Sequence, residues 1–317
     1  MNQNTAQELS EKGLLPDAII RAGIRRLLRE RLEEIAADDV EQSAAREQAL
    51  LGIMREGPIA EVPELANEQH YEVPAEFFAR VLGTHRKYSC GYWPEGVTHL
   101  DGAEQAALEE TASHAGLADG QRILELGCGW GSLSLYLAER FPASEILAVS
   151  NSRSQGAYIR ECAAERGLGN LSVVTADMNA FAPAGAFDRI VSVEMFEHMR
   201  NWEALLARAS DWLVPSGRLF IHIFVHRAVP YLFEDKGAAD WMSRHFFSGG
   251  MMPSADLPLR FARKLAIDAQ WTWNGNHYAR TCRAWLKQMD RNKGAVMPSL
   301  EDTYGAGNPG RWSMRWR

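Results

Sequence analysis

A glycine-rich segment between a predicted strand and a predicted helix constrains this chain more than any other feature. The segment reads Ile123-Leu-Glu-Leu-Gly-Cys-Gly-Trp-Gly131, with glycines at three alternate positions. Glycine lets the backbone turn sharply and lets a ligand approach without a Cβ in the way. A strand, a tight turn and a helix in this order predict an α/β fold with a ligand site at the turn.

The residues on either side of this turn continue the pattern. Apolar segments predict strands, and periodic segments predict helices. The strands are expected at 122–126, 145–150, 171–175, 187–193 and 218–224, and the helices at 132–140, 152–166 and 202–213. Alternating strands and helices give a parallel sheet covered on both faces. Residues 266–273 are predicted to form a sixth strand, and residues 228–262 a helical insertion after the fifth.

The N-terminal part of the chain predicts two amphipathic helices within residues 14–54, separated at Asp38-Asp39. Apolar residues recur there at spacings of three and four and form one stripe: Ile20, Ile24, Leu27, Leu28, Leu32 and Ile35. Such a stripe is typical of a helix that packs against a core. Gly57-Pro58 and Pro63 mark a linker. We expect residues 1–66 to form a helical lid and residues 67–317 to form the main domain.

The spacing of the glycines favours one ligand over another. A GxGxxG turn cradles a pyrophosphate, whereas Gly127, Gly129 and Gly131 read GxGxG and follow Glu125. A carboxylate at Glu125 would repel a diphosphate but would favour the cationic amino group of a methionine moiety. Backbone N–H groups at the helix start would hold the methionine carboxylate. The turn therefore indicates S-adenosylmethionine rather than a dinucleotide; the alternative is a tight turn without a ligand.

The next two strands end in residues that suit the rest of this cofactor. Ligands of open α/β sheets bind at the carboxyl ends of the strands. The side-chain amides of Asn151 and Gln155 can bind ribose hydroxyls, although Asn151 would equally suit a helix cap. Asp177 can accept a hydrogen bond from the adenine amino group, and Met178 can cover the ring.

Three ionisable residues follow the fourth strand: Glu194, Glu197 and His198. Glu194 and His198 lie four residues apart, so they share a face if a helical turn begins there. Methyl transfer from a sulfonium needs a nucleophile with a free lone pair, and an alkylamine with a pKa of about 10 is mostly protonated at pH 7. A carboxylate and an imidazole can take that proton. The alternative is a helix-capping Glu194 with a core histidine.

Other polar and aromatic residues are expected near the same crevice. His222 lies at the end of the fifth strand, and Cys90 belongs to an aromatic-rich segment before the sheet. A metal site from Cys90, Glu197 and His222 has no supporting local spacing, so no metal is predicted. Aromatic rings can hold both an amine ring and a sulfonium cation. The candidates for this are Tyr71, Tyr92, Trp93, Phe246 and Phe247.

Composition excludes several other kinds of protein. The net charge is −7 and no basic block stands out, which argues against nucleic acid as a partner. No run of 18 apolar residues and no apolar N-terminal core occur, so no stable membrane insertion is expected. Four scattered cysteines without CxxC spacing favour reduced thiols in the cytoplasm. A homodimer stays open.

Several stretches together resemble the cyclopropane fatty acid synthase superfamily, and within it the coclaurine N-methyltransferase branch. The resemblance covers roughly residues 60–317, and the matching stretches are 88–93, 123–131, 192–199, 221–224, 246–254 and 274–278. It implies a Rossmann-like class I methyltransferase that uses S-adenosylmethionine and releases S-adenosylhomocysteine. The N-terminal helical extension and the insertion after the fifth strand would cover the substrate.

The resemblance also implies roles for individual residues. Glu194 and His198 match a pair that orients and deprotonates a substrate amine, with Glu197 beside them. The implied cofactor contacts are Tyr88, Ser89, Glu125, Gly127, Gly129, Asn151, Gln155, Asp177 and Met178. The implied substrate contacts are Tyr71, Trp93, His222, Phe224, Phe246 and Phe247.

Three departures from the lipid-modifying branch bear on the substrate. That branch has a small residue in place of Glu194 and an aliphatic residue in place of Phe224. It also has a large lipid-binding N-terminal domain. The resemblance therefore favours a small cyclic or aromatic amine, such as a tetrahydroisoquinoline. The alternatives are an enzyme that modifies unsaturated acyl chains with bicarbonate as base, and an inactive cofactor-binding relative. The family continues beyond the stretch that here ends at Arg317, so its final strand is expected to be missing.

Overall fold

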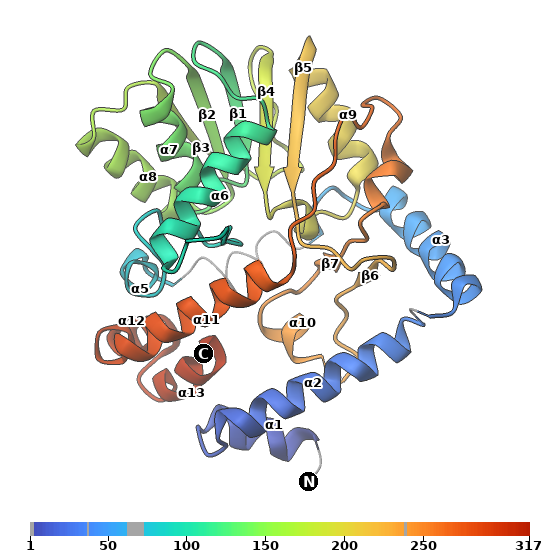
Figure 1. Cartoon of the computed structure of the whole chain (residues 1–317), viewed down its shortest axis with the longest axis vertical. Coiled ribbons are helices and arrows are strands. Elements are labelled where there is room, and N and C mark those ends of the chain that lie inside the picture. The colour runs from blue at the N-terminus through green and yellow to red at the C-terminus, as the bar shows by residue number, and fades with distance from the viewer. Residues whose placement is uncertain (1–2, 37, 62–72, 238–239) are drawn as a thin grey trace.

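The chain folds around a five-stranded parallel sheet (Figure 1). The computed structural model describes residues 3–36, 38–61, 73–237 and 240–317. The strands are β1 (Arg122–Leu126), β2 (Glu145–Ser150), β3 (Leu171–Thr175), β4 (Phe187–Val193) and β5 (Leu213–His222). Their order is β3-β2-β1-β4-β5, and every neighbouring pair is parallel. The order reverses beside β1, which opens a ligand crevice at the carboxyl ends of β1 and β4. The predicted α/β class is confirmed.

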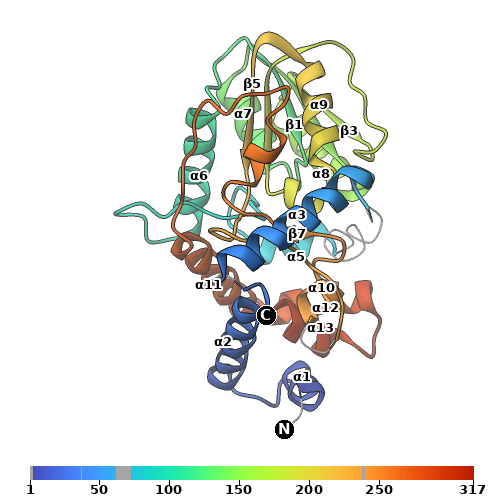
Figure 2. The same cartoon turned by 90° about the vertical axis from the view of Figure 1, so that its right-hand side faces the viewer.

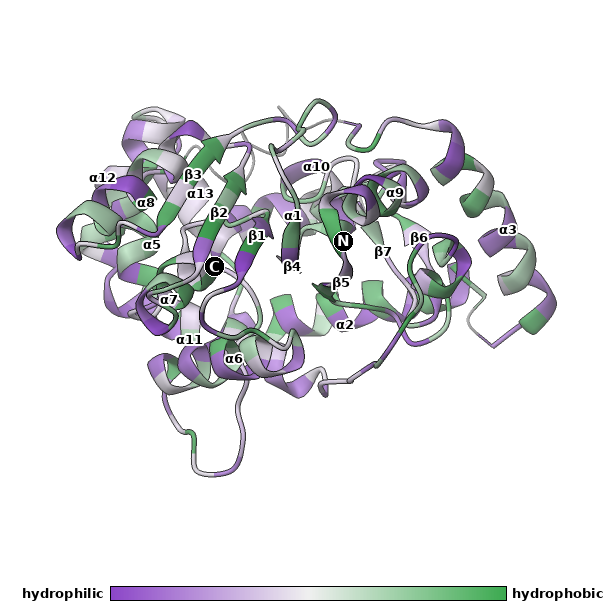
Figure 3. Ribbon diagram, turned by 90° about the horizontal axis from the view of Figure 1, so that it is seen from above, coloured by the Kyte–Doolittle hydropathy of each residue, from purple (hydrophilic) through white to green (hydrophobic). Residues whose placement is uncertain are grey.

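Helices cover both faces of the sheet, because successive strand side chains point to opposite faces. One face carries α6 (Leu100–His114), α7 (Ser132–Arg140) and α8 (Arg153–Glu165). Ile123 and Val191 pack on this side. The other face carries α3 (Val40–Glu56) and α9 (Trp202–Trp212), and Leu124 and Ile190 pack there. In Figure 3, β2 and β3 are mainly green, whereas the helices alternate between green and purple.

A further layer lies beyond the carboxyl ends of the strands, in the lower part of Figures 1 and 2. It contains α5 (Ala75–Val81), α11 (Asn276–Arg291), α12 (Lys293–Tyr304) and α13 (Pro309–Trp316). Phe77, Phe78 and Val296 lie in its buried core. The predicted insertion holds α10 (Trp241–His245), the short antiparallel strands β6 (Tyr231–Leu232) and β7 (Met251–Met252), and the 3-10 helix η2 (Leu257–Phe261).

The N-terminal helices are present as predicted, but the first long one packs differently. The chain begins with α1 (Gln3–Glu11) and α2 (Asp17–Glu34). The predicted break is confirmed, because Asp39 caps α3 by accepting a hydrogen bond from the backbone N–H of Gln42. The predicted apolar stripe is only partly covered: Ile35, just after α2, is buried, and Ile20 and Leu27 are half-buried. No residue of α2 is buried, and Ile24, Leu28 and Leu32 are 50%, 58% and 46% exposed.

Three local features differ from the sequence prediction. The predicted strand at 266–273 does not form a strand; Trp271 instead stacks on His114 of α6, with ring centroids 4.1 Å apart. Strand β5 begins earlier than predicted, with an irregular register near β4, and ends at His222. After β4 the chain forms the 3-10 turn η1 (Phe196–His198). A helical turn cannot begin at Glu194, because its φ of +50° is left-handed.

Two further expectations concern the membrane and the boundary between the domains. Among the described residues, no helix is long and apolar enough to cross a membrane. The expected boundary between lid and main domain, at residues 66 and 67, lies outside the described residues, as does Tyr71.

Candidate active site

The glycine turn after β1 forms one wall of the crevice. Gly127, Gly129 and Gly131 all have positive φ angles, of +77°, +52° and +78°. A Cβ at Gly127 would lie 2.8 Å from Met195, and one at Gly131 would lie 2.6 Å from Ile159. A Cβ at Gly129 would meet nothing within 4 Å. The outer two glycines therefore allow close packing, while Gly129 leaves the backbone open to a ligand.

Two adjoining cavities open at this turn. The first has about 750 Å³ of empty space and extends along the ends of β2, β3 and β4. Its lining includes Gly127, Gly129, Asn151, Gln155, Asp177, Met178, Glu194 and His198. The second has about 540 Å³ and includes Lys87, Tyr88, Ser89, Glu125, Gly127, Gly129 and Glu194. All nine predicted cofactor residues thus line one cavity or the other, and Glu194 lies where the cavities meet.

The polar groups of these cavities suit S-adenosylmethionine. Gln155 is 1% exposed and accepts a hydrogen bond from Ser150 through Oε1. Its Nε2 donor has no partner among the described residues, and neither has the Ser132 hydroxyl in the second cavity. A buried donor without a partner is costly, and ribose hydroxyls and a methionine carboxylate would satisfy such donors. These two buried donors, which lack a partner within the described residues, therefore fit the predicted cofactor.

Two acidic residues near the cofactor cavities are already held by the protein. Asp177 accepts hydrogen bonds from the backbone and side-chain amides of Asn179. Glu125 is buried and accepts a hydrogen bond from the Ser134 hydroxyl. Burial raises the pKa of Glu125 to about 7. Glu125 therefore joins the turn to α7 as well as lining the second cavity.

Glu194 is the best-oriented acid of the site. Its left-handed φ, which directs the chain out of β4, is fixed by a 2.7 Å hydrogen bond from its N–H to the carbonyl of His222. Its Oε1 accepts from the backbone N–H of Cys90 at 2.9 Å, and its Oε2 accepts from the Tyr278 hydroxyl at 2.9 Å. Burial raises the pKa of Glu194, while the cation of Lys87 and these hydrogen bonds lower it.

Glu197 lies one turn further on and has no such support. It is fully buried, and neither carboxyl oxygen meets the geometry of a hydrogen bond within the described chain, although the backbone of Phe224 lies close. Burial and the charge of Glu194 raise the pKa of Glu197 well above its usual range. Burial and this neighbouring charge therefore favour the protonated form of Glu197.

Aromatic rings form a wall beside His198. The His198 ring stacks on Phe247, with centroids 4.5 Å apart and planes 13° apart. Phe224 and Phe233 contact Phe247 edge to face, at 5.6 and 5.1 Å, and Tyr278 lies 6.5 Å from Phe224. We call Phe224, Phe233, Phe247 and Tyr278 the aromatic wall. Phe247 lies against His198, and Phe224 lies against Phe247, but no residue of the aromatic wall is among those that line the two cavities.

Three other predicted substrate residues serve the packing around the site. The Trp93 indole donates to Thr281 of α11 at 2.9 Å. Phe246 is buried against Trp241 and Trp316. His222 meets the edge of Trp273 at 4.5 Å, and burial together with Lys87 lowers its pKa to about 3. None of the three is among the residues that line the two cavities.

Three residues at the site were not expected from the sequence: Lys87, Phe233 and Tyr278. Tyr278 lies within the resembling stretch 274–278 but was given no role. Lys87 comes directly before the predicted Tyr88 and Ser89. Phe233 follows the short strand β6, and no signal in the sequence distinguishes it from other surface aromatics.

Comparison with known proteins agrees with this geometry. The family described as mycolic acid cyclopropane synthetase matches residues 61–304. (S)-coclaurine N-methyltransferase of Thalictrum flavum subsp. glaucum is 37% identical over 290 residues, which is 91% of this chain and 80% of the relative. The cyclopropane-fatty-acyl-phospholipid synthase of Escherichia coli K12 is 28% identical over 76% of this chain and 59% of the relative.

Solved structures show the same division. A crystal structure of coclaurine N-methyltransferase bound to N-methylheliamine and S-adenosylhomocysteine superimposes with a TM-score of 0.94 at 35% identity, covering 99% of this chain and 91% of that one. A mycolic acid cyclopropane synthase with S-adenosylhomocysteine gives 0.67 at 22% identity, covering 80% and 91%, which shows the common fold. Fold, glycine turn and cavities define a class I S-adenosylmethionine-dependent methyltransferase. The chain belongs to the mycolic acid cyclopropane synthetase family, and its similarity is greater to the N-methyltransferases than to the lipid-modifying enzymes.

Proposed function

We propose that this enzyme methylates the nitrogen of a small cyclic or aromatic amine, such as a tetrahydroisoquinoline. The observation that carries the proposal is the Glu194 carboxylate, held between the Cys90 N–H and the Tyr278 hydroxyl where the two cavities meet. A carboxylate fixed by two donors attracts a protonated amine. The aromatic wall supplies flat apolar surface for a ring. The relatives named as coclaurine N-methyltransferases support this substrate class.

The residues of the site divide the reaction between them. Glu194 orients the ammonium form of the amine, and His198, exposed to the same cavity, accepts its proton. The freed lone pair then forms the N–C bond as the C–S bond of the donor breaks. S-adenosylmethionine supplies the electrophilic methyl group and leaves as S-adenosylhomocysteine. Burial and the charge of Glu194 favour the protonated form of Glu197, so that the charge of Glu194 would balance the ammonium.

The test is a methyl-transfer assay over tetrahydroisoquinolines and simple amines, read by mass spectrometry. Phospholipid vesicles with unsaturated acyl chains and added bicarbonate form the second arm. We expect an N-methylated product in the first arm and none in the second. Lipid modification that rises with bicarbonate would overturn the proposal in favour of the lipid-modifying alternative. Cofactor binding without any product would favour an inactive relative.

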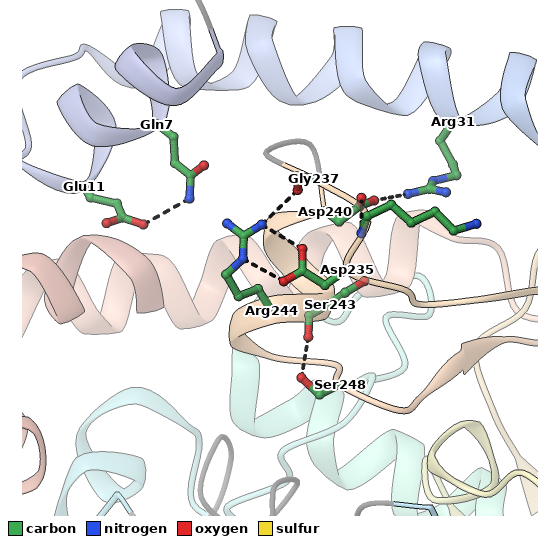
Figure 4. A network of polar contacts seen from close by, with 10 residues as sticks. Gln7, Glu11, Arg31, Asp235, Gly237, Asp240, Ser243, Arg244 and Ser248 are labelled. Carbon is green, nitrogen blue, oxygen red and sulfur yellow. Dashed lines mark hydrogen bonds and ion pairs between the residues drawn. The ribbon is translucent and has the colours of Figure 1, made fainter.

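We also propose that the N-terminal helices act as a lid on the amine side of the site. Two polar contacts join them to α10 of the insertion. Arg31 of α2 donates to Asp240 at 2.6 Å (Figure 4), and the Trp241 indole donates to Glu11 of α1 at 3.0 Å. Just after α10, Phe247 stacks on His198, and Ser248 lines the first cavity. These contacts would hold the insertion over a bound amine.

Removing the contacts between α2 and α10 should therefore affect the amine and not the cofactor. We expect Arg31→Gln to raise KM for the amine about threefold, because a partly exposed ion pair is worth up to about 1 kcal/mol, with an unchanged affinity for S-adenosylhomocysteine. Asp240→Asn should do the same, and the double variant should be no worse than either single one. Unchanged KM in all three variants would contradict the lid.

We propose that the protein forms a homodimer through the exposed apolar face of α2. Ile24, Leu28 and Leu32 repeat every four residues on one face of the helix and are about half exposed, and a second copy of the helix would cover them. Sedimentation should show a dimer that Leu28→Glu converts to a monomer; a monomeric wild-type protein would contradict this.

We also propose that the protein is located in the cytoplasm. All four cysteines are free, which supports a reducing compartment.

A further inference from the structure

A lysine with no assigned role lies behind the active site. Lys87 is 3% exposed, although lysine is rarely buried unless its charge is paired. Its Nζ donates to the Ser89 hydroxyl at 2.5 Å and to the carbonyl of Cys90 at 2.8 Å. Both acceptors belong to the loop before α6. The ammonium group therefore holds this loop together through two hydrogen bonds on its buried side.

The loop that Lys87 closes is the one that holds Glu194. The carbonyl of Cys90 accepts from Lys87, and the N–H of Cys90 donates to Glu194 Oε1 at 2.9 Å. A single residue thus transmits the position of the ammonium group to the carboxylate. Lys87 also lines the second cavity together with Glu194, so the two charges face the same space.

Charged and titratable groups of several elements face this pair, including His198 of η1, which lines the first cavity together with Glu194. Acidic groups around Lys87 are Glu194, Glu104 of α6, Glu125 of β1 and the Cys90 thiol. Glu194 is also faced by Glu197 of η1, by Tyr278 and Cys282 of α11, and by Cys90. His222 of β5 faces Lys87 and stays uncharged because its pKa is about 3. Burial lowers the pKa of Lys87, whereas the negative charges around it, that of Glu194 first among them, raise its pKa and favour its ammonium form.

We infer that Lys87 is a positioning residue for methyl transfer, which keeps Glu194 ionised and keeps the Cys90 N–H directed at it. This inference rests on the proposed role of Glu194. A buried cation near a carboxylate favours the charged form of the carboxylate, and here it acts on an acid that burial would otherwise neutralise. The amine substrate needs that charge for its orientation before it loses a proton.

The test compares two substitutions at Lys87 at saturating amine and cofactor, where the pH dependence of kcat reports groups in the bound complex. Lys87→Met keeps the length and removes both charge and donor. Lys87→Gln keeps a donor and removes the charge. We expect both variants to lower kcat at pH 7 at least fivefold and to move the acidic limb of the kcat profile upward by about one pH unit, since the pKa of Glu194 rises without the cation.

Thr281→Val is the matched control. Thr281 accepts from the N–H of Gly91 at 3.1 Å and from the Trp93 indole at 2.9 Å, so it braces the same loop without carrying charge. We expect this variant to lose thermal stability and activity while keeping the wild-type pH profile. Binding of S-adenosylhomocysteine, measured by calorimetry, shows that each variant is folded.

The outcomes separate this inference from the proposed function. A folded Lys87 variant with a wild-type pH profile would overturn the inference, as would a profile restored by Lys87→Gln. Glu194→Gln with wild-type activity would instead overturn the role of Glu194 on which the inference rests. Where Lys87→Met fails to fold, Lys87→Gln decides. Adding Lys87→Gln to Glu194→Gln should produce no further shift, because the titrating carboxylate is then absent.

Discussion

The cofactor half and the amine half of the active site are built in different ways. Most of the cofactor half consists of residues at or just after the ends of strands, such as Gly127 after β1, Asn151 after β2 and Asp177 shortly after β3. The amine half combines Glu194 with Cys90 and Tyr278, which lie 104 and 84 residues away along the chain. Most of the cofactor site thus comes from residues 125–178, at the ends of three neighbouring strands, whereas the amine site forms only once three segments more distant along the chain have packed together.

The largest expected effect is that of a substitution at Glu194, which should impair the amine half and leave the cofactor half intact. Glu194→Gln keeps the size of the side chain and removes the charge that orients the amine. We expect kcat to fall at least about a hundredfold, the usual scale for an acid–base group. The affinity for S-adenosylhomocysteine should stay within about threefold of wild type. An equal loss of cofactor affinity would show that the halves are not separate.

Tyr278→Phe should weaken the amine half less. The phenol O–H stabilises the ionised form of Glu194, so its loss raises the pKa of that carboxyl group. We expect kcat at pH 7 to fall about tenfold, since a hydrogen bond to a charged group is worth about 1.5–3 kcal/mol, and the acidic limb of the profile to move to higher pH. Tyr304→Phe, a change in a hydroxyl that pairs with Trp316 far from Glu194, is the control and should keep the wild-type profile.

Gln155→Leu should affect the cofactor half alone. The variant removes the buried amide donor that lacks a partner within the described chain. We expect the Kd for S-adenosylmethionine to rise about fivefold, because one neutral hydrogen bond contributes roughly 0.5–1.5 kcal/mol. At saturating cofactor, kcat should stay within about twofold. A lower kcat at unchanged Kd would place Gln155 in the amine half instead.

The smallest effect concerns stability, in the protein without cofactor. Burial raises the pKa of Glu125 from 4.5 to about 7, so the folded state holds a proton that the unfolded state releases. The free energy of unfolding should therefore be highest below pH 4.5 with respect to this group and should fall as the pH rises to 7. Glu125→Gln should reduce this fall by roughly 1–3 kcal/mol. The exposed Glu301→Gln should leave it unchanged, and chemical denaturation at several pH values measures both.

The same difference explains what the sequence could predict. The strand ends, the glycine turn and the residues after β2 and β3 follow from local patterns, and the structure places them around one crevice. Tyr278 was missed because only packing of α11 beneath the sheet brings it to Glu194. Lys87 was missed because a lysine is ordinarily a surface residue.

The error at α2 has a related cause. An apolar stripe has the same spacing whether the core of its own chain or another surface covers it. The sequence therefore predicts the helix correctly but does not distinguish Ile35, which is buried, from Ile24 and Leu28, which are exposed. The strand predicted at 266–273 does not form, because Trp271 stacks on His114 of α6 and the segment pairs with no strand among the described residues.

The contact between α1 and α13 has a consequence for the order of folding. Arg315 of α13 donates to Glu11 of α1 at 3.0 Å across a sequence separation of 304 residues. Helix α1 precedes the five strands along the chain, whereas α13 follows all of them. Contacts of such separation form late in folding. The five strands and their helices can therefore assemble before α1 meets α13, so the contacts of the N-terminal helices belong to a late stage of folding.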